Sequence, residues 1–197
     1  MRRFSILATV TVLGCFAFVS AVSISTPTSA ADATSGAETP SALHAYAPTV
    51  DPGQTPFSVA DRLAITNLIY AYALAWDNYE TDTWFSFFTP DAIFVASQPG
   101  MKPVSFTGAE FHHFWGDRLT HFKSSGNQRR HLMSNILFLD ETAASAHVSI
   151  LALLTNVKDG KAFTVETSLN YEGWFVKSNG AWKIKRWHDF PDSGVAE

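Results

Sequence analysis

The carboxylate of Asp77 follows a strongly apolar segment, and its position raises the question of what it pairs with. The stretch YALAWDN (72–78) places Asp77 directly after Tyr72, Leu74 and Trp76. A buried carboxylate is costly unless it is hydrogen-bonded or paired with a cation. Either the helix that this segment predicts ends in water at Asp77, or Asp77 has a partner inside the protein.

Further polar groups lie in the strand-like segment RHLMSNILFLD (130–140). Alternation along a strand puts His131, Met133 and Asn135 on one face. Both faces of this segment are mostly apolar, so we expect the strand to be covered on both sides. His131 and Asn135 would then be polar groups in an apolar setting, and each needs a hydrogen-bond partner.

Two other groups of histidines admit a functional or a structural interpretation. His188 shares a face of the last strand-like run with Arg186, and if that face points inward His188 would lie at the mouth of a pocket. The alternative is a histidine with a structural role, hydrogen-bonded within the protein. His113, Asp117 and His121 are spaced four residues apart on a helix, as metal ligands can be. The two histidines are about 12 Å apart along the helix axis, too far to share one ion, so we expect a solvated face and no metal site.

The N-terminal segment has the pattern of a secretory signal peptide. Arg2 and Arg3 precede a long apolar run, and small residues follow up to Ala30 and Ala31. We therefore expect residues 1–31 to be removed and the protein to be secreted or periplasmic, with no stable membrane association after cleavage. The alternative is an anchor that stays attached.

Removal of residues 1–31 would also remove Cys15, the one cysteine in the chain. The mature protein would have no disulfide, thiol nucleophile or thiolate metal site. The formal net charge would change from −4 to −6, because residues 1–31 contain two arginines and no acidic residue. This acidic balance, without a basic run, argues against nucleic acid as a partner.

The remaining chain divides into a linker, one domain and a tail. Residues 32–56 are rich in Ala, Thr, Ser and Pro without a sustained period, which is typical of a flexible linker. The domain is expected at 57–190, followed by a tail at 191–197. Hydrophobic periodicity predicts helices at 58–77 and 82–88 and a third beginning near Gly108. A strand (IFVAS) and four strand-like runs joined by polar turns complete an α+β domain, with a natural pocket between the helices and a bent antiparallel sheet.

The order of four segments resembles SnoaL-like proteins of the nuclear-transport-factor-two-like superfamily. These segments are YALAWDNYETDTWFSFFTPDAIF, FTGAEF, RRHLMSN and NYEGWFVKSNGAWKI, and the resemblance covers residues 58–188. It implies a cone-shaped, curved antiparallel sheet covered by three helices, which encloses an apolar pocket. Members include polyketide cyclases, scytalone dehydratase, a bile-acid dehydratase, a dehydrochlorinase and an epoxide hydrolase. Ring-hydroxylating dioxygenase small subunits share the fold without chemistry of their own, so fold alone does not give function.

The resemblance also implies roles for individual residues. Several catalytic members pair an aspartate at the end of the first helix with a histidine that opens the strand after the third helix, and Asp77 and His131 resemble these. Tyr72 resembles a tyrosine of the bile-acid dehydratase, although five residues correspond to about 140° around a helix, and plain core is its alternative. Asn156 aligns roughly with a second histidine of scytalone dehydratase. This departure puts that particular dehydration in doubt, but Asn156 could still bind a substrate oxygen.

Together these observations predict an exported protein that binds a small hydrophobic molecule of polyketide, aromatic or steroid type. The expected chemistry is cofactor-free dehydration, isomerisation or cyclisation, with His131 as general base and Asp77 as its orienting partner. The expected catalytic and binding residues are Asp77, His131, Tyr72, Asn135, Met133, Trp76, Asn156 and His188. The alternative is a non-catalytic module that binds a small molecule or associates with other subunits, and homo-oligomerisation is left open.

Overall fold

The structure, a computed structural model, describes residues 58–194, so the predicted signal peptide and linker lie outside the described residues. Within 58–194 no helix is long and apolar enough to cross a membrane. The α+β class is confirmed. The elements are α1 (Val59–Asp77), α2 (Thr81–Ser86), β1 (Phe88–Ala96), β2 (Val104–Thr107), α3 (Gly108–Ser124), β3 (Asn127–Glu141), β4 (Ser145–Lys158), β5 (Ala162–Ser178) and β6 (Ala181–Pro191).

Helix α1 buries the face that its periodicity predicts. Ile65, Ile69, Tyr72 and Trp76 are all buried. At its N-terminus, Ser58 Oγ accepts a hydrogen bond from the backbone N–H of Asp61 at 3.2 Å, which satisfies one of the helix's exposed donors. At its C-terminus the chain turns immediately, and the carboxylate of the last helical residue, Asp77, is left inside the protein.

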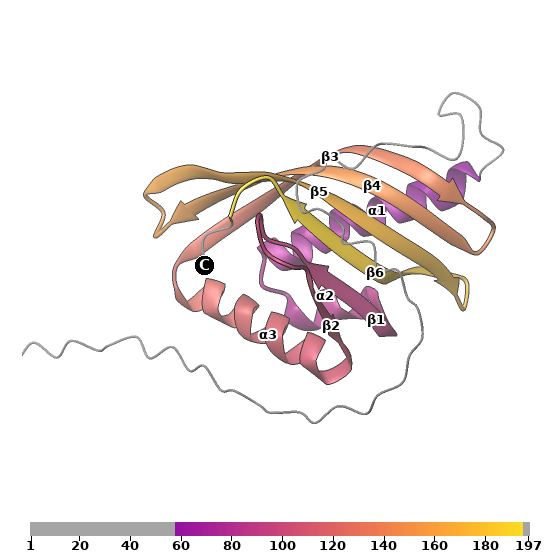
Figure 1. The fold of residues 1–197 in the computed structure, drawn as a ribbon, viewed down its shortest axis with the longest axis horizontal. Helices are drawn as coiled ribbons and strands as arrows, with labels where there is room; N and C mark the ends of the chain where they lie inside the picture. Colours follow the sequence, from indigo (N-terminus) through magenta and orange to yellow (C-terminus); the bar gives the residue numbers. More distant parts are fainter. Residues whose placement is uncertain (1–57, 195–197) are drawn as a thin grey trace, which may run out of the picture. The chain divides into compact units, whose positions relative to one another are not determined.

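The six strands form one mixed sheet in the order β2-β1-β6-β5-β4-β3, and all three helices lie on the same side of the four long strands (Figure 1). The sequence predicts an antiparallel sheet, and neighbouring strands from β6 to β3 are indeed antiparallel. However, β1 pairs with β6 in parallel. The short strand β2, which the sequence did not indicate, adds an antiparallel edge to β1.

A β-bulge in β3 changes which residues share a face. The register passes from Ser134–Leu151 to Leu137–Ser149, so two residues of β3 oppose one residue of β4. Asn135 lies in this bulge with φ of +46° and is exposed. An extra residue reverses the alternation beyond it. The prediction that Asn135 shares the face of His131 is therefore wrong.

A second bulge, in β6, has the same effect near the end of the domain. Ile184 pairs with Phe175 and Arg186 with Trp174, which leaves Lys185 as the extra residue. Paired residues share a face, so beyond this bulge Asp189, opposite Tyr171, turns toward the helices. His188, opposite Glu172, turns to the other face.

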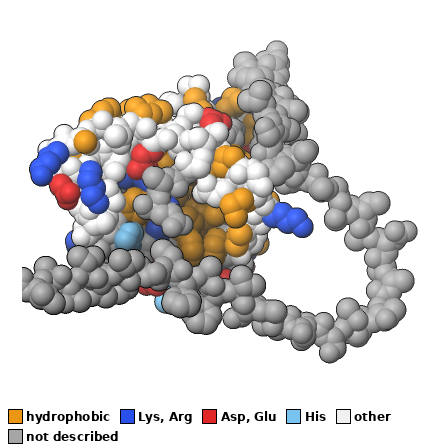
Figure 2. All heavy atoms as spheres, turned by 60° about the vertical axis from the view of Figure 1, so that its left-hand side comes forward, with side chains coloured by type: hydrophobic (Ala, Val, Ile, Leu, Met, Phe, Trp, Pro, Cys, Tyr) orange, Lys and Arg blue, Asp and Glu red, His pale blue; other side chains and the backbone are white. Residues whose placement is uncertain are grey.

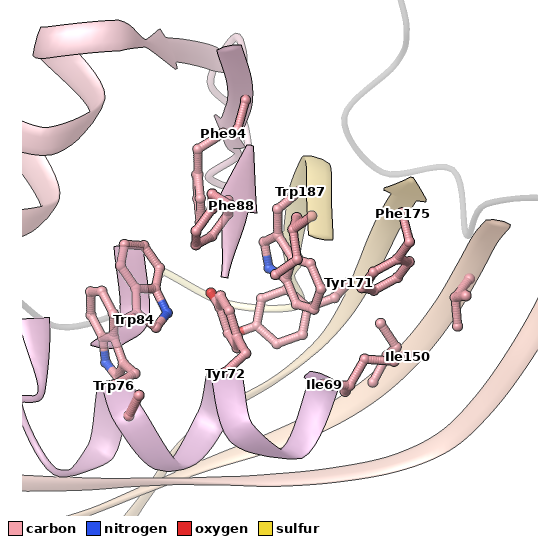
Figure 3. Close-up of a cluster of buried hydrophobic side chains, with 14 of the residues drawn as sticks. Ile69, Tyr72, Trp76, Trp84, Phe88, Phe94, Ile150, Tyr171, Phe175 and Trp187 are labelled. Carbon is pink, nitrogen blue, oxygen red and sulfur yellow. The ribbon is translucent and has the colours of Figure 1, made fainter. Parts of the chain in front are cut away.

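The core is dominated by aromatic rings between α1, α2, α3 and the sheet. Trp84 is fully buried and contacts Tyr72, Trp76 and Phe88 with centroid separations of 5.5, 5.2 and 4.9 Å. Tyr72 stacks on Trp187 of β6 at 4.4 Å (Figure 3). Such pairs add packing energy beyond the area they bury. They fix the position of α1 against the strands, and with it the position of Asp77.

Candidate active site

A cavity of about 410 Å³ lies between the inner face of the sheet, helices α1 and α3, and the β1–β2 connection. Its wall is largely aromatic, and hydrophobic side chains gather in a hollow on the face shown in Figure 2. The aromatic lining residues are Tyr72, Trp76, Phe94, Phe106, Phe114, Trp115 and Tyr171. A pocket of this size and composition suits a small, largely apolar ligand.

The side chains of Asp77 and His131 meet at the wall of this cavity. His131 Nδ1 lies 2.6 Å from Asp77 Oδ1, and the backbone N–H of His131 donates to Asp77 Oδ2 at 2.8 Å. Both side chains are buried, with 4% of His131 and 3% of Asp77 exposed. Two bonds from one residue hold the carboxylate and favour the tautomer in which Nδ1 carries the proton.

This arrangement turns the remaining imidazole nitrogen toward the cavity. His131 lines the cavity, whereas Asp77 lies behind it. Among residues 58–194, no side chain bonds to Nε2 of His131. Gln128 Nε2 donates to the backbone carbonyl of Asp77 at 2.7 Å and so ties the end of α1 to β3. The pair is therefore held by hydrogen bonds on the Asp77 side, and Nε2 of His131 is open toward the cavity.

Tyr72 also lines the cavity, together with Tyr171 of β5. The angle of about 140° that separates Tyr72 from Asp77 on a regular helix is no obstacle, because Asp77 reaches the cavity through His131. Burial raises the pKa of both phenols well above the usual value. Each therefore stays protonated at neutral pH and can donate a hydrogen bond to an oxygen in the cavity.

Of the predicted binding residues, only Trp76 lines the cavity. Met133 packs against the core, and Asn135 is exposed at the bulge of β3. Asn156 donates through Nδ2 to Asn127 Oδ1 at 3.0 Å and lies outside the cavity lining. His188 is buried on the outer side of β6, where Nε2 lies 2.8 Å from Ser97 Oγ. The expected place of His188 at the pocket mouth is wrong, because the bulge at Lys185 reverses its face.

The residue that sequence reasoning missed is Asp189. It lines the cavity from β6 and accepts a hydrogen bond from the backbone N–H of Ser97 at 2.7 Å. Burial raises the pKa of its carboxyl to about 7, while the Ser97 bond and the nearby Arg118 act in the opposite direction. Uninterrupted alternation puts Asp189 on the outer face, so only knowledge of the bulge could have identified it.

Cations also line the cavity, and the sequence did not indicate them. Arg129 of β3 pairs with Glu166 at 2.6 Å, and both side chains are nearly inaccessible, with 5% and 9% exposed. Arg118 of α3 and Lys102 of the β1–β2 connection also line the cavity. Glu166 occupies the extra position of a bulge in β5, which turns it toward Arg129.

The described residues contain no group of three or more side chains that could hold a metal ion. His113 and Asp117 lie 3.5 Å apart on α3, and both side chains are largely exposed. This agrees with the solvated face that their spacing suggested.

The sequence profile of the SnoaL-like domain matches residues 58–188. The match covers most of the chain and nearly all of the described domain. The protein belongs to the SnoaL-like family. No protein in the comparison with curated sequences matches it.

Solved structures extend the likeness of this SnoaL-like protein to the fold. ActVI-ORFA of Streptomyces coelicolor is 20% identical, with a TM-score of 0.57 over 68% of this chain and 98% of its own. A protein of Novosphingobium aromaticivorans described as a scytalone dehydratase is 18% identical, with a TM-score of 0.58 over 71% and 89%.

A third similar structure is described as the beta subunit of an aromatic-ring-hydroxylating dioxygenase, also from Novosphingobium aromaticivorans. It is 16% identical, with a TM-score of 0.59 over 71% of this chain and 95% of its own. At these identities the likeness establishes the fold and leaves the activity to the site itself.

Proposed function

We propose that this SnoaL-like domain binds a small, largely apolar molecule and acts on it by cofactor-free acid–base catalysis. His131 is the general base and Asp77 its orienting partner. The observation that carries the proposal is the 2.6 Å contact between these side chains at the wall of an aromatic cavity. A histidine fixed at Nδ1 presents Nε2 as the base, and the carboxylate stabilises the imidazolium that forms.

The chemistry follows from these positions. Nε2 of His131 takes a proton from a carbon or oxygen of the bound molecule. The electron pair that is left forms a new double bond as a leaving group departs, or attacks a carbonyl carbon of the same molecule, whose oxygen takes the C=O electron pair and then the proton from His131. In a dehydration, a C–O bond breaks and the imidazolium of His131 returns its proton to the departing hydroxyl, which leaves as water. Tyr72, a protonated phenol on the same cavity, is suited to hydrogen-bond that oxygen. The aromatic wall keeps bulk water away from the reacting groups.

The first step of the test identifies the substrate, by mass spectrometry of ligand that copurifies with the protein. Turnover and thermal melting are then measured for His131→Ala and Asp77→Asn. The exposed pair on α3 supplies a matched control, because His113→Ala removes the same side chain from a histidine–aspartate contact outside the cavity. Loss of turnover in the first two variants, with melting retained, supports the proposal. Unfolded variants make the pair structural, and full activity refutes the general base.

A second candidate is a non-catalytic subunit, which one surface favours. Leu132, Leu151 and Leu153 are exposed by 52%, 39% and 37% on the outer face of β3 and β4. Leu132 and Leu153 are directly paired. Contiguous exposed apolar side chains of this kind are typical of association surfaces. Sedimentation of the wild type and of Leu132→Glu tests this: a monomer in both cases removes the subunit hypothesis.

We also propose that the protein acts outside the cytoplasm, on the strength of the charged, apolar and small-residue pattern of residues 1–31. N-terminal sequencing of secreted material should begin near Ala31 or Asp32. A chain that retains Met1, or one with a lipid on Cys15, contradicts this.

A further inference from the structure

The cavity has a second polar end, away from Asp77 and His131. Asp189 lies on β6 and His131 on β3, with β5 and β4 between them in the sheet. Neighbouring strands are about 4.8 Å apart, so three strand spacings, about 14 Å across the sheet, separate the backbones of β6 and β3. Tyr171 of β5 and Leu154 of β4 line the cavity between them. A ligand that reaches both ends is therefore an elongated molecule with an apolar or aromatic middle.

The Asp189 carboxyl is held through one oxygen and open at the other. Oδ1 accepts the Ser97 N–H at 2.7 Å, and Ser97 is itself fixed by the contact of its Oγ with His188. Within residues 58–194, no other residue donates a hydrogen bond to Oδ2, although the backbone N–H of Asp189 itself also favours the charged carboxyl, and Asp189 lines the cavity. A carboxyl in this position can share a proton with an oxygen of a bound molecule.

The charges of the lining side chains indicate the class of that molecule. Among the described residues that line the cavity, Asp189 is the one carboxyl group, whereas Lys102, Arg118 and Arg129 are cations. Arg129 faces Glu166 behind the wall. Arg118 lies close enough to Asp189 to influence its titration. A cavity with this balance, in a chain with a negative net charge, favours an anionic group on the ligand.

We propose that Asp189, Arg118 and Lys102 form a subsite for a carboxylate, so that the substrate is an elongated apolar carboxylic acid with its reacting centre at His131. This inference rests on the proposed function, because it describes the far end of the same ligand. The cations attract the carboxylate, and protonated Asp189 donates a hydrogen bond to one of its oxygens.

Binding at this subsite is linked to protonation of Asp189. The titratable groups whose charges act together with that of Asp189 are Arg118 from α3, Tyr171 from β5 and Tyr72 from α1, and Lys102 from the β1–β2 connection lines the same cavity. Burial keeps both phenols protonated near neutral pH, so we assign the change of protonation to Asp189. Its carboxyl has a pKa of about 7 and is half protonated at that pH. Binding of a carboxylate at pH 7 is then accompanied by uptake of as much as about half a proton by Asp189. Above pH 7 the affinity for the carboxylate falls by up to about tenfold per pH unit.

The experiment compares two rigid probes of the same size, 2-naphthoate and 2-naphthamide, by titration calorimetry on the purified protein. Calorimetry in two buffers of different ionisation enthalpy gives the number of protons taken up. We expect 2-naphthoate to bind at least about tenfold more tightly than the amide at pH 6, with proton uptake that grows from pH 6 to pH 8. The amide should show neither proton uptake nor pH dependence.

Variants separate the subsite from the catalytic pair. Asp189→Asn should abolish the proton uptake, and Arg118→Gln should weaken 2-naphthoate while leaving the amide unchanged. Lys123→Gln, an exposed cation on the same helix, is the matched control and should change neither. His131→Ala should retain the preference for 2-naphthoate even if it abolishes turnover, so the two proposals can fail separately. Equal binding of the two probes, binding without proton uptake, or no binding of 2-naphthoate at millimolar concentration would each overturn the carboxylate subsite.

Discussion

Asp77 and Asp189 both serve the cavity, but the structure gives them different partners. Asp77 is held at both oxygens by His131 and lies behind the wall. Asp189 accepts a hydrogen bond from the backbone N–H of Ser97 and faces the cavity directly. The histidine contact gives Asp77 a fixed partner for its charge, whereas burial raises the pKa of Asp189 to about 7.

This difference shows how surroundings assign a role to a side chain. A carboxylate that accepts two hydrogen bonds from a base is suited to orient that base. A buried carboxyl that has few hydrogen bonds or cations to stabilise its charged form is suited to gain and lose a proton near neutral pH. Substitutions that remove one carboxylate at a time should therefore affect different properties: loss of the Asp77 carboxylate should lower turnover, and loss of the Asp189 carboxylate should raise stability at high pH.

The largest expected effect is on turnover at the Asp77 end. His131→Ala removes the proposed general base and should lower the rate by about 10²–10⁴-fold. Asp77→Asn can present its NH₂ group to the imidazole and favour the wrong tautomer, so we expect a comparable loss. Because the residues act as a unit, the double variant should be little worse than either single variant. Kinetics of the three variants check this; additive losses would mean that the residues act independently.

The next effect is on stability at the Asp189 end. The folded protein raises the pKa of this carboxyl from 3.8 to about 7, so the folded state holds the proton more tightly than the unfolded state. The contribution of Asp189 to the free energy of unfolding is therefore fully present below about pH 4 and is lost as the pH rises to about 7. Asp189→Asn should be more stable than the wild type at pH 8, by at most about 4 kcal/mol, since each pKa unit corresponds to about 1.4 kcal/mol. Denaturant unfolding at pH 4.5 and pH 8 measures the difference, and an equal difference at both values would contradict the raised pKa.

A smaller effect is expected in the aromatic core next to the cavity. A Cβ at Gly173 would lie 2.6 Å from the ring of Phe175 and 3.0 Å from that of Trp187, which stacks on Tyr72. Gly173→Ala should therefore destabilise the domain by about 1–3 kcal/mol through overpacking. Gly116→Ala in α3 is the control of opposite sign: its nearest contact is 3.9 Å, so it should stabilise the helix by about 0.5–1 kcal/mol. Melting curves distinguish the two variants, and an unchanged melting temperature for Gly173→Ala would mean that the neighbouring rings can move to accommodate the added methyl group.

No effect is expected from metal removal. The described residues hold no group of three or more side chains that could ligate a metal ion. Incubation with a chelator should leave the melting temperature and probe binding unchanged. A fall in melting temperature or probe binding that added zinc reverses would show that the protein binds a metal ion.

The sequence predicted the helical framework and one end of the cavity well. Apolar residues at helical spacing identified the buried face of α1, and a carboxylate after Trp76 indicated an internal partner. The resemblance to SnoaL-like proteins supplied His131 as that partner, and the structure places the two side chains in contact.

The errors arise where a strand carries an extra residue. Alternation is a reliable guide only while pairing is continuous, and a bulge shifts every later side chain to the opposite face. The bulge in β3 places Asn135 on the solvent side, and the bulge in β6 places Asp189 rather than His188 at the cavity. Nothing in the local sequence marks Lys185, since lysine is an ordinary residue on a solvated strand face. Asn135 is a weak signal, because asparagine is rare in strands and tolerates the positive φ of this bulge.

The place of β6 in the sheet also sets the order in which the domain can assemble. β6 is the last described strand, yet it joins β1 and β2 to β5, β4 and β3. Until residues 181–191 are available, the remaining strands form two separate pieces, and Tyr72 lacks Trp187. Contacts between α1 and β6 span more than a hundred residues, and such non-local pairing forms slowly. The nascent chain therefore stays open until its last strand emerges, and a chain truncated before β6 would have neither a continuous sheet nor the Asp189 end of its cavity.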